Sequence, residues 1–422
     1  MTLFRLASTC GVACLALATM VHGYGAGFTG KKVVDGYYPS YSVSPENVLY
    51  SNYTHLNYFV FTTTPDASAI SQAGIDDSTI TDFVARAHAA GITVSYTVGG
   101  YTGSQYFSSN VATAANRTVF AQTLVSVMQE YDFDGIDIDW EYPGTQGEGD
   151  NIVSPNDAGN FLLFLQTLRN VAGVDARLSM AASVGGIYGP DGTILTDMSA
   201  WATVLDYVTV MTYDITGTWS GFTGPNAPLY GTCEPASNPY NIQSGVNIYI
   251  QAGFQPNHVL FGFPGYSYSY YVTPPLKSTT CSDGSTSTLY QYPAGTNCGN
   301  WVGSGSQYLY SDLVSNGWFE PQSGFRRIRD STSQTVVLYN PQTQLFIPTE
   351  DPISAWAKAR YAFQRRLAGV NVFDVSGDTP DGALVTQLRN GLYLNGATSI
   401  PTSRLAKRHL EEKARRAKLA SH

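Results

Sequence analysis

The sequence predicts an α/β protein, a (β/α)8 barrel of the TIM type that carries a small α+β insertion subdomain. Three observations predict it. Short apolar runs alternate with longer segments of helical period, as in a parallel sheet wrapped by helices. Eight such runs can be counted, which is the number of strands in this barrel. One late stretch lacks helical periodicity and is too long for an ordinary loop.

The expected strands are short and apolar, and turn-forming or polar residues separate them from the helical segments. In chain order they are Val33–Tyr38, Leu56–Thr62, Thr93–Gly99, Gly135–Trp140, Leu178–Val184, Tyr207–Tyr213, Val259–Phe263 and Val370–Val375. Their carboxyl ends form one face of such a barrel, where active sites are built.

Helix boundaries can be recognised between these strands from capping residues. Asp77 and Ser78 precede the expected helix Thr79–Ala90, and Gly91 follows it. Two further helices with the same kinds of boundary are expected, Ala158–Val171 and Ile353–Leu367.

The chain divides into four parts on this basis. Residues 1–23 form a signal peptide, 24–265 and 347–400 the barrel, 266–346 the α+β insertion, and 401–422 a basic, disordered tail. The insertion is rich in Tyr, Ser, Thr and Gly, and it separates the seventh expected strand from the eighth. At that position it borders the mouth of the barrel.

The N-terminus predicts secretion. One positive charge precedes an apolar run, Leu6–Val21, which ends in His22 and Gly23. The run is shorter than the roughly 20 residues that a membrane-spanning helix requires. We therefore expect cleavage near Gly23, an extracellular protein and no membrane association afterwards.

Secretion makes disulfides and glycans possible in the mature chain. Three cysteines remain, Cys233, Cys281 and Cys298, and the last two share one Gly/Ser/Thr/Asn-rich stretch. A Cys281–Cys298 bridge is the expected pairing, although spacing alone leaves the connectivity open. Asn52 and Asn116 begin the two N-glycosylation sequons that we identify.

The charge and the histidine spacing argue against nucleic-acid binding and against a metal site. The formal net charge is −9 and the sequence pI about 5.1, so no overall basic field exists to bind nucleic acid. The six histidines lack metal-ligand spacing, so we expect no metal and no cofactor. We expect a monomer.

Three acids alternate along the fourth expected strand. Asp137, Asp139 and Glu141 share one face of that strand, while Ile136 and Ile138 lie on the other. Acids buried so close together respond by holding protons. A protonated acid at the carboxyl end of a barrel strand can donate to a leaving oxygen, which favours catalysis over a metal site or a purely structural strand.

The segment around these acids, Asp132 to Pro143, resembles the signature of family 18 chitinases. The similarity extends from about Val33 to about Arg389. Thr97-Val98-Gly99-Gly100 is similar to the third-strand motif of the family, and Met211-Thr212-Tyr213-Asp214 to its sixth-strand motif.

The resemblance implies hydrolysis of β-1,4 bonds in chitin or N-acetylglucosamine oligosaccharides by substrate assistance. Glu141 would protonate the glycosidic oxygen while the acetamide carbonyl of the cleaved sugar attacks its own anomeric carbon. Asp139 would orient the acetamide and share a proton with Asp137, and Tyr213 would bind the carbonyl. The substrate-binding residues implied are Asp134, Tyr37, Thr97, Gly99, Gly100, Tyr101, Met211, Asp214, Trp219, Tyr266 and Phe373.

Two residues depart from the pattern of the family. Phe373 stands where a Trp usually forms the floor under the cleaved sugar, and Tyr268 replaces a usual Arg. A chitin-binding protein without activity is therefore one alternative, which the intact Glu141 disfavours. An endo-β-N-acetylglucosaminidase acting on N-glycan cores is another, which the large insertion disfavours.

Overall fold

The computed structural model describes residues 32–72, 74, 76–232, 239–280, 284, 286–296 and 299–393. The predicted signal peptide and basic tail lie outside these residues. So do Cys233, Cys281 and Cys298, and with them the predicted Cys281–Cys298 bridge.

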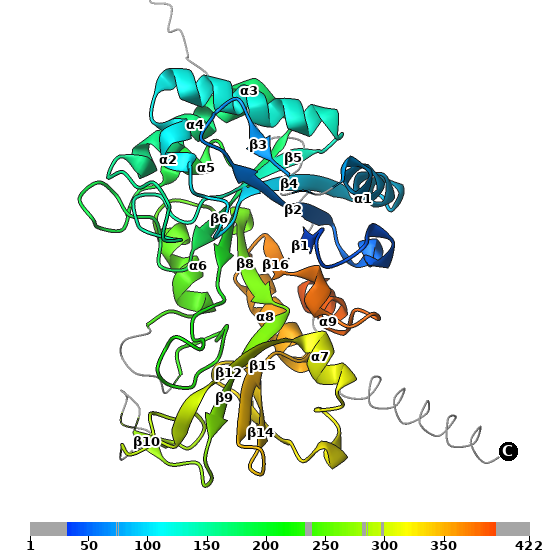
Figure 1. The fold of residues 1–422 in the computed structure, drawn as a ribbon, viewed down its shortest axis with the longest axis vertical. Coiled ribbons are helices and arrows are strands. Elements are labelled where there is room, and N and C mark those ends of the chain that lie inside the picture. The colour runs from blue at the N-terminus through cyan, green and yellow to red at the C-terminus, as the bar shows by residue number, and fades with distance from the viewer. Residues whose placement is uncertain are drawn as a thin grey trace, which may run out of the picture.

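In the described residues, eight parallel strands close into a barrel with helices around it, as predicted (Figure 1). The first strand pairs with both the second and the last, which closes the sheet. Around the barrel the strands are β1 (Val33–Pro39), β2 (His55–Thr63), β4 (Thr93–Gly99), β5 (Gly135–Asp139), β6 (Arg177–Ser183), β7 (Tyr207–Met211), β8 (Val259–Pro264) and β16 (Gly369–Phe373). Each expected strand overlaps one of them.

Helices α1 (Asp77–Ala89), α2 (Phe107–Val111), α3 (Ala114–Glu130), α4 (Asp157–Ala172), α5 (Ser199–Ala202), α6 (Ile242–Gln251), α8 (Pro352–Gln364) and α9 (Ala383–Tyr393) belong to the barrel part of the chain. The cap of α1 is Asp76, one residue before the predicted cap, because its carboxylate accepts the Ser78 backbone N–H. None of the helices within the described ranges has the length and apolarity needed to cross a membrane.

The insertion is built on a five-stranded antiparallel sheet below the barrel in Figure 1. In spatial order its strands are β12 (Trp301–Leu309), β9 (Tyr266–Val272), β15 (Leu345–Thr349), β14 (Thr335–Asn340) and β13 (Arg326–Asp330). Helix α7 (Tyr310–Ser315) and the short pair β10 (Thr279–Thr280) and β11 (Thr286–Ser287) complete it. The sheet begins at the predicted boundary and ends three residues past 346, because β15 continues to pair with β14 as far as Thr349.

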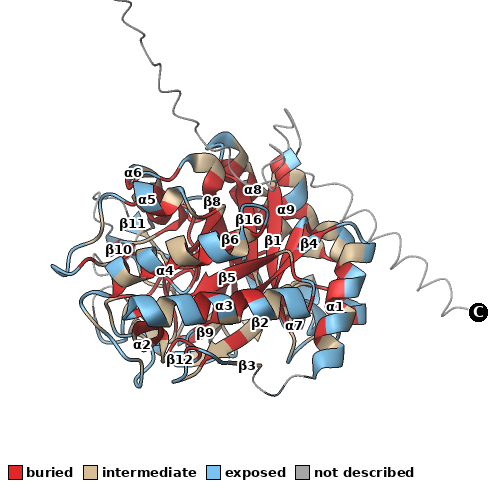
Figure 2. Cartoon of the chain, turned by 90° about the horizontal axis from the view of Figure 1, so that it is seen from above, coloured by how far each residue is buried: buried red, intermediate tan, exposed pale blue. Residues whose placement is uncertain are grey.

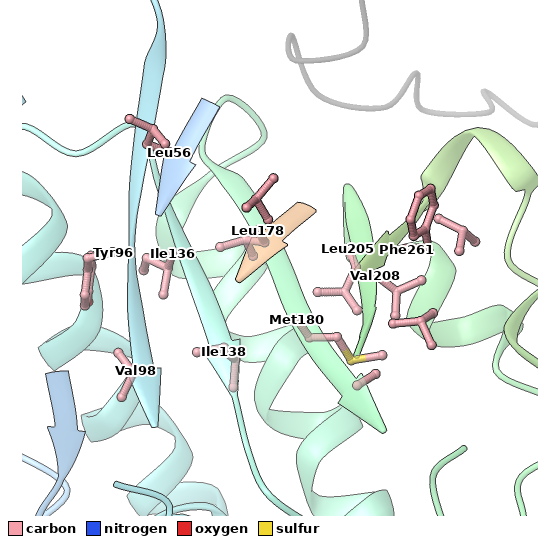
Figure 3. Packing of buried hydrophobic residues seen from close by; sticks show 14 of the residues in the cluster. Leu56, Tyr96, Val98, Ile136, Ile138, Leu178, Met180, Leu205, Val208 and Phe261 are labelled. Carbon is pink, nitrogen blue, oxygen red and sulfur yellow. The ribbon is translucent and has the colours of Figure 1, made fainter. Parts of the chain in front are cut away.

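The main apolar core lies between the barrel strands and the helices. Buried residues concentrate on the strands and on the inner faces of the helices (Figure 2). Ile136 and Ile138 of β5 lie in this layer beside Leu178 and Met180 of β6 (Figure 3). Trp140 follows them on the same side and stacks on Phe107 with ring centroids 5.2 Å apart. The opposite face of β5 therefore points into the barrel.

The interior of the barrel is polar. Arg177 and Asp35 form an ion pair at 2.6 Å, and Asn57 Nδ2 donates to the other oxygen of Asp35 at 3.1 Å. Burial raises the pKa of Asp35 to about 6, although the Arg177 charge opposes that rise. This ion pair lies beneath the residues described below.

A second buried ion pair fixes α8 to the end of the insertion. Lys358 is fully buried, and its ammonium donates to Glu350 and, at 2.6 Å, to the Ala227 carbonyl. Ser354 Oγ donates to the same carboxylate at 2.6 Å. Burial raises the pKa of Glu350 and lowers that of Lys358, so each charge depends on the other.

We predict that Lys358→Met lowers the free energy of unfolding by about 3 to 5 kcal/mol, because it leaves the buried Glu350 charge unpaired. Urea denaturation at pH 7 measures the loss. The double variant with Glu350→Gln removes both charges and should recover more than half of it. An equal loss in the single and double variants would contradict this role of the pair.

Candidate active site

A cleft of about 750 Å³ opens at the carboxyl ends of the barrel strands. It is lined by three acids, several aromatic rings and small residues that follow β2, β4, β5, β6, β7 and β16. These residues are Phe59, Val60, Gly99, Gly100, Tyr101, Thr102, Asp139, Glu141, Tyr142, Ser183, Val184, Met211, Tyr213, Asp214, Trp219, Tyr268 and Phe373.

Asp137 lies under the cleft and is fully buried. Tyr37 and Thr97 each donate a hydroxyl to its Oδ2 at 3.1 Å, and Ser179 donates to Oδ1 at 2.6 Å. Burial raises the pKa of Asp137, and these three hydrogen bonds oppose that rise. Both oxygens of Asp137 are thus held in place.

Asp139 is one step nearer the cleft and only 4 % exposed. Its Oδ1 is buried and has no hydrogen-bond partner among the described residues. Burial raises its pKa well above the ordinary value, and the neighbouring Glu141 and Asp137 add to the rise. Asp139 is therefore a carboxyl that favours its protonated form and whose hydrogen-bonding capacity is not fully used among the described residues.

Glu141 follows the end of β5 and is 9 % exposed within the cleft. Its backbone is fixed by two bonds, because its N–H donates to Ser104 Oγ at 3.0 Å and its carbonyl accepts Asn151 Nδ2 at 2.8 Å. Burial raises the pKa of Glu141 to about 7, a hydrogen bond from Tyr142 lowers it, and the Asp214 charge raises it. Such a group can both donate and accept a proton near neutral pH.

Aromatic rings form the floor of the cleft. Phe373 stacks on Tyr213 with ring centroids 5.5 Å apart and an interplanar angle of 28°. Tyr37 and Tyr266 meet the Phe373 ring edge-on at 5.5 and 6.2 Å. Neither Tyr37 nor Tyr266 lines the cleft itself. Both instead pack against Phe373, which does line the cleft.

Asp214 lies on the cleft wall, and burial of its carboxyl raises its pKa, while hydrogen bonds from Tyr266 and Tyr268 oppose that rise. Its Oδ1 accepts the hydroxyls of Tyr266 at 2.6 Å and Tyr268 at 2.7 Å. Tyr268, which replaces the usual Arg of the family, thus binds this acid as a neutral donor. The exposed ring of Trp219 meets Tyr268 edge-on at 5.0 Å.

Most of the predicted site residues lie together. Gly99, Gly100, Tyr101, Met211, Tyr213, Asp214, Trp219 and Phe373 line the cleft with Asp139 and Glu141. Gly99 has φ of +115°, and a Cβ there would lie 2.0 Å from the Asp139 carbonyl oxygen, so only glycine fits.

Asp134 does not join them, which corrects its place in the predicted substrate-binding set. It precedes β5 at the amino end of the strand, whereas the cleft lies at the carboxyl end. Its Oδ2 accepts the Val94 backbone N–H at 2.7 Å and lies 3.0 Å from His88 Nε2. Asp134 therefore joins α1 to the start of β4 and β5.

Sequence reasoning missed several residues of the cleft wall. They are Phe59, Val60, Thr102, Tyr142, Ser183 and Val184. Phe59 and Val60 lie within β2, and the other four lie at or just after the carboxyl end of a barrel strand, where that position was the available signal.

The predicted glycosylation residues lie elsewhere on the barrel. Asn52 is half-buried in a short 3₁₀ helix, Tyr50–Asn52. Asn116 lies in the first turn of α3, and its Nδ2 donates to the Ser109 carbonyl at 3.0 Å. Over the described ranges, no three His, Cys, Asp or Glu side chains form a group that could hold a metal ion.

The family model of the glycosyl hydrolases family 18 matches residues 33–378. The chain belongs to this family. It is a glycoside hydrolase of the chitinase type, and family 18 chitinases act on chitin or its oligosaccharides.

Three similar proteins illustrate the relationship. A chitinase-like effector of Moniliophthora roreri is 33% identical over 386 residues, covering 86% of this chain and 93% of the relative. Chitinase A1 of Niallia circulans is 31% identical over 294 residues, which cover 67% of this chain and 40% of the relative. The crystal structure of a chitinase from Rhizomucor miehei matches with a TM-score of 0.74 at 25% identity, covering 85% of this chain and all of that one.

The pKa of Glu141 predicts how this family 18 site affects stability. The pKa rises from 4.5 to about 7 on folding, so the fold loses stability as the pH rises through that range. Glu141→Gln cannot ionise and removes this loss. Between pH 4.5 and 8, the free energy of unfolding of the variant should rise relative to wild type by about 1 to 3 kcal/mol.

Urea denaturation across this pH range measures the effect. Glu148→Gln is the matched control, because it neutralises an exposed carboxyl of the same loop. If the free energies of unfolding of Glu141→Gln and Glu148→Gln, each relative to wild type, change with pH in the same way, Glu141 is not the group with the raised pKa.

Proposed function

We propose that this protein hydrolyses β-1,4 linkages between N-acetylglucosamine units of chitin or its oligosaccharides, with Glu141 as the general acid. One observation carries the proposal. Glu141 is an acid with a pKa of about 7 that lines an aromatic-floored cleft directly above Asp139 and Asp137. A group with that pKa holds a proton at the pH where a leaving oxygen requires one.

In the first step Glu141 gives its proton to the glycosidic oxygen, and the bond from that oxygen to the anomeric carbon breaks. The acetamide carbonyl oxygen of the same sugar attacks the anomeric carbon and forms a cyclic oxazolinium ion. In the second step the Glu141 carboxylate takes a proton from a water molecule, whose oxygen attacks the anomeric carbon and breaks its bond to the acetamide oxygen, which opens the oxazolinium ring. The sugar regains its acetamide and Glu141 its proton.

Asp139 is the residue that binds the acetamide N–H in this scheme. The support for this role is its Oδ1, which lacks a partner among the described residues. Asp137 would stabilise Asp139 from below and share its proton, although its own oxygens accept three hydroxyls in the resting site. Tyr213, packed on Phe373, would donate its hydroxyl to the acetamide carbonyl.

Two departures in the cleft favour a second candidate, a protein that binds chitin fragments without cleaving them. Phe373 provides a smaller floor than a Trp, and Tyr268 brings no positive charge to Asp214. The three acids in one row favour hydrolysis instead. A third candidate, cleavage within the chitobiose core of N-glycans, has no such observation behind it.

We also propose that the protein is secreted and acts outside the cell. The support is the composition of residues 1–23, with one early basic residue and an apolar stretch that ends in small and polar residues. Glycans on Asn52 and Asn116 belong to the same proposal.

Wild-type protein should release the chromophore from a chromogenic chitobioside. Glu141→Gln should lower kcat at least about a hundredfold, because the general acid is lost, while KM changes by less than about threefold. Glu148→Gln should keep full activity. An inactive wild type with intact binding would favour the second candidate, and a fully active Glu141→Gln would remove Glu141 from its role.

Activity should depend on pH through the same group. Glu141 loses its proton as the pH rises through about 7, so kcat/KM should fall about tenfold for each further pH unit. Tyr142→Phe removes the hydrogen bond that lowers the pKa of Glu141, so the falling limb should move to higher pH. Tyr271→Phe, an exposed ring on β9, should leave the limb in place. A limb that moves to lower pH in Tyr142→Phe contradicts the assignment.

A further inference from the structure

The described residues that line the cleft include acids but no basic side chain. Three carboxyls line it, those of Asp139, Glu141 and Asp214. No Lys, Arg or His occurs among its described lining residues. Asp139 and Glu141 both have raised pKa values, because they are buried. Burial also raises the pKa of Asp214, but the hydroxyls of Tyr266 and Tyr268 oppose that rise, and the residue as a whole is exposed on the wall of the cleft.

The position of Asp214 is fixed by its surroundings. Its backbone takes a φ of +57°, and its N–H donates to Asn226 Oδ1 at 2.6 Å. Asn226 in turn donates to the Tyr266 carbonyl at 3.1 Å. With two tyrosine hydroxyls on Oδ1, the carboxylate is held in one orientation, and no described residue forms an ion pair with it.

Trp219 provides an exposed aromatic face beside this carboxylate. Its ring is 60 % exposed and meets the Tyr268 ring edge-on, with an interplanar angle of 79° and a centroid distance of 5.0 Å. Tyr268 also donates to Asp214, so the three side chains form one unit. A fixed carboxylate next to an open indole ring is an arrangement that binds an ammonium group, through charge attraction and a cation–π contact.

We propose that Asp214, Trp219 and Tyr268 form a subsite for a glucosamine unit, the deacetylated sugar that carries an ammonium group. This inference rests on the proposed function and names its preferred substrate as partly deacetylated chitin. The reacting sugar must keep its acetamide, because that group attacks the anomeric carbon. The glucosamine unit therefore occupies an adjoining position in the cleft, and Tyr268 determines the preference by leaving Asp214 without a cation.

The test compares two variants at one position. Tyr268→Arg supplies a guanidinium that pairs with Asp214 and repels an ammonium group, whereas Tyr268→Phe removes the hydroxyl without adding charge. Wild type should show a kcat/KM on half-acetylated oligosaccharides about three- to tenfold above that on fully acetylated ones at low salt. Tyr268→Phe should keep this ratio, and Tyr268→Arg should abolish it. Raising the salt concentration should reduce it, because ions screen exposed charges.

A second measurement does not require turnover. Calorimetry with the Glu141→Gln background compares the affinity for half-acetylated and fully acetylated pentamers, alone and combined with each Tyr268 variant. Tighter binding of the half-acetylated pentamer that Tyr268→Arg removes and Tyr268→Phe keeps would support the subsite, even if hydrolysis failed. Equal affinities for the two pentamers, or the same ratio in both variants, would overturn it while leaving hydrolysis of fully acetylated substrate untouched.

Discussion

Closure of the barrel turns every second side chain along β5, and along the residues just after it, toward the barrel interior and the cleft above it. Asp137, Asp139 and Glu141 occupy these inward positions, and Ile136, Ile138 and Trp140 occupy the outward ones. The same alternation that completes the apolar core therefore places acids in a row. Because the acids are buried, they hold protons more strongly than in water, and this property makes the site chemically useful.

The three acids receive unequal numbers of hydrogen bonds to compensate for the loss of contact with water. Asp137 receives three hydroxyls, while Asp139 keeps one oxygen without a partner, and Glu141 is fixed through its backbone more than its carboxylate. Hydrogen bonding thus decreases from the barrel interior toward the cleft. Within this row of three acids, the unpartnered oxygen belongs to Asp139, which lines the cleft, and not to Asp137 beneath it.

The sequence was sufficient where local alternation decides the outcome. The barrel strands could be predicted from short apolar runs between helical segments, and the inward acids on and just after β5 from a period of two residues, because neither pattern needs knowledge of the rest of the chain. Asp134 was misplaced, because its side chain belongs to the amino end of the strand, and a motif does not say at which end each of its members acts. The contacts of Tyr268 with Asp214 and of Phe373 with Tyr213 could not be predicted, since they join segments that only the folded barrel brings together.

The pairing of β1 with β16 has a consequence for biosynthesis. The barrel closes only when Gly369–Phe373 can reach Val33–Gly36, and Phe373 also supplies part of the cleft floor. A ribosome makes the chain from its amino end, so the segment with the three acids is synthesised long before β16, the last strand of the barrel. Until that late segment is translated, the acids stand in an open sheet exposed to water, and the nascent chain has no finished cleft with which to act.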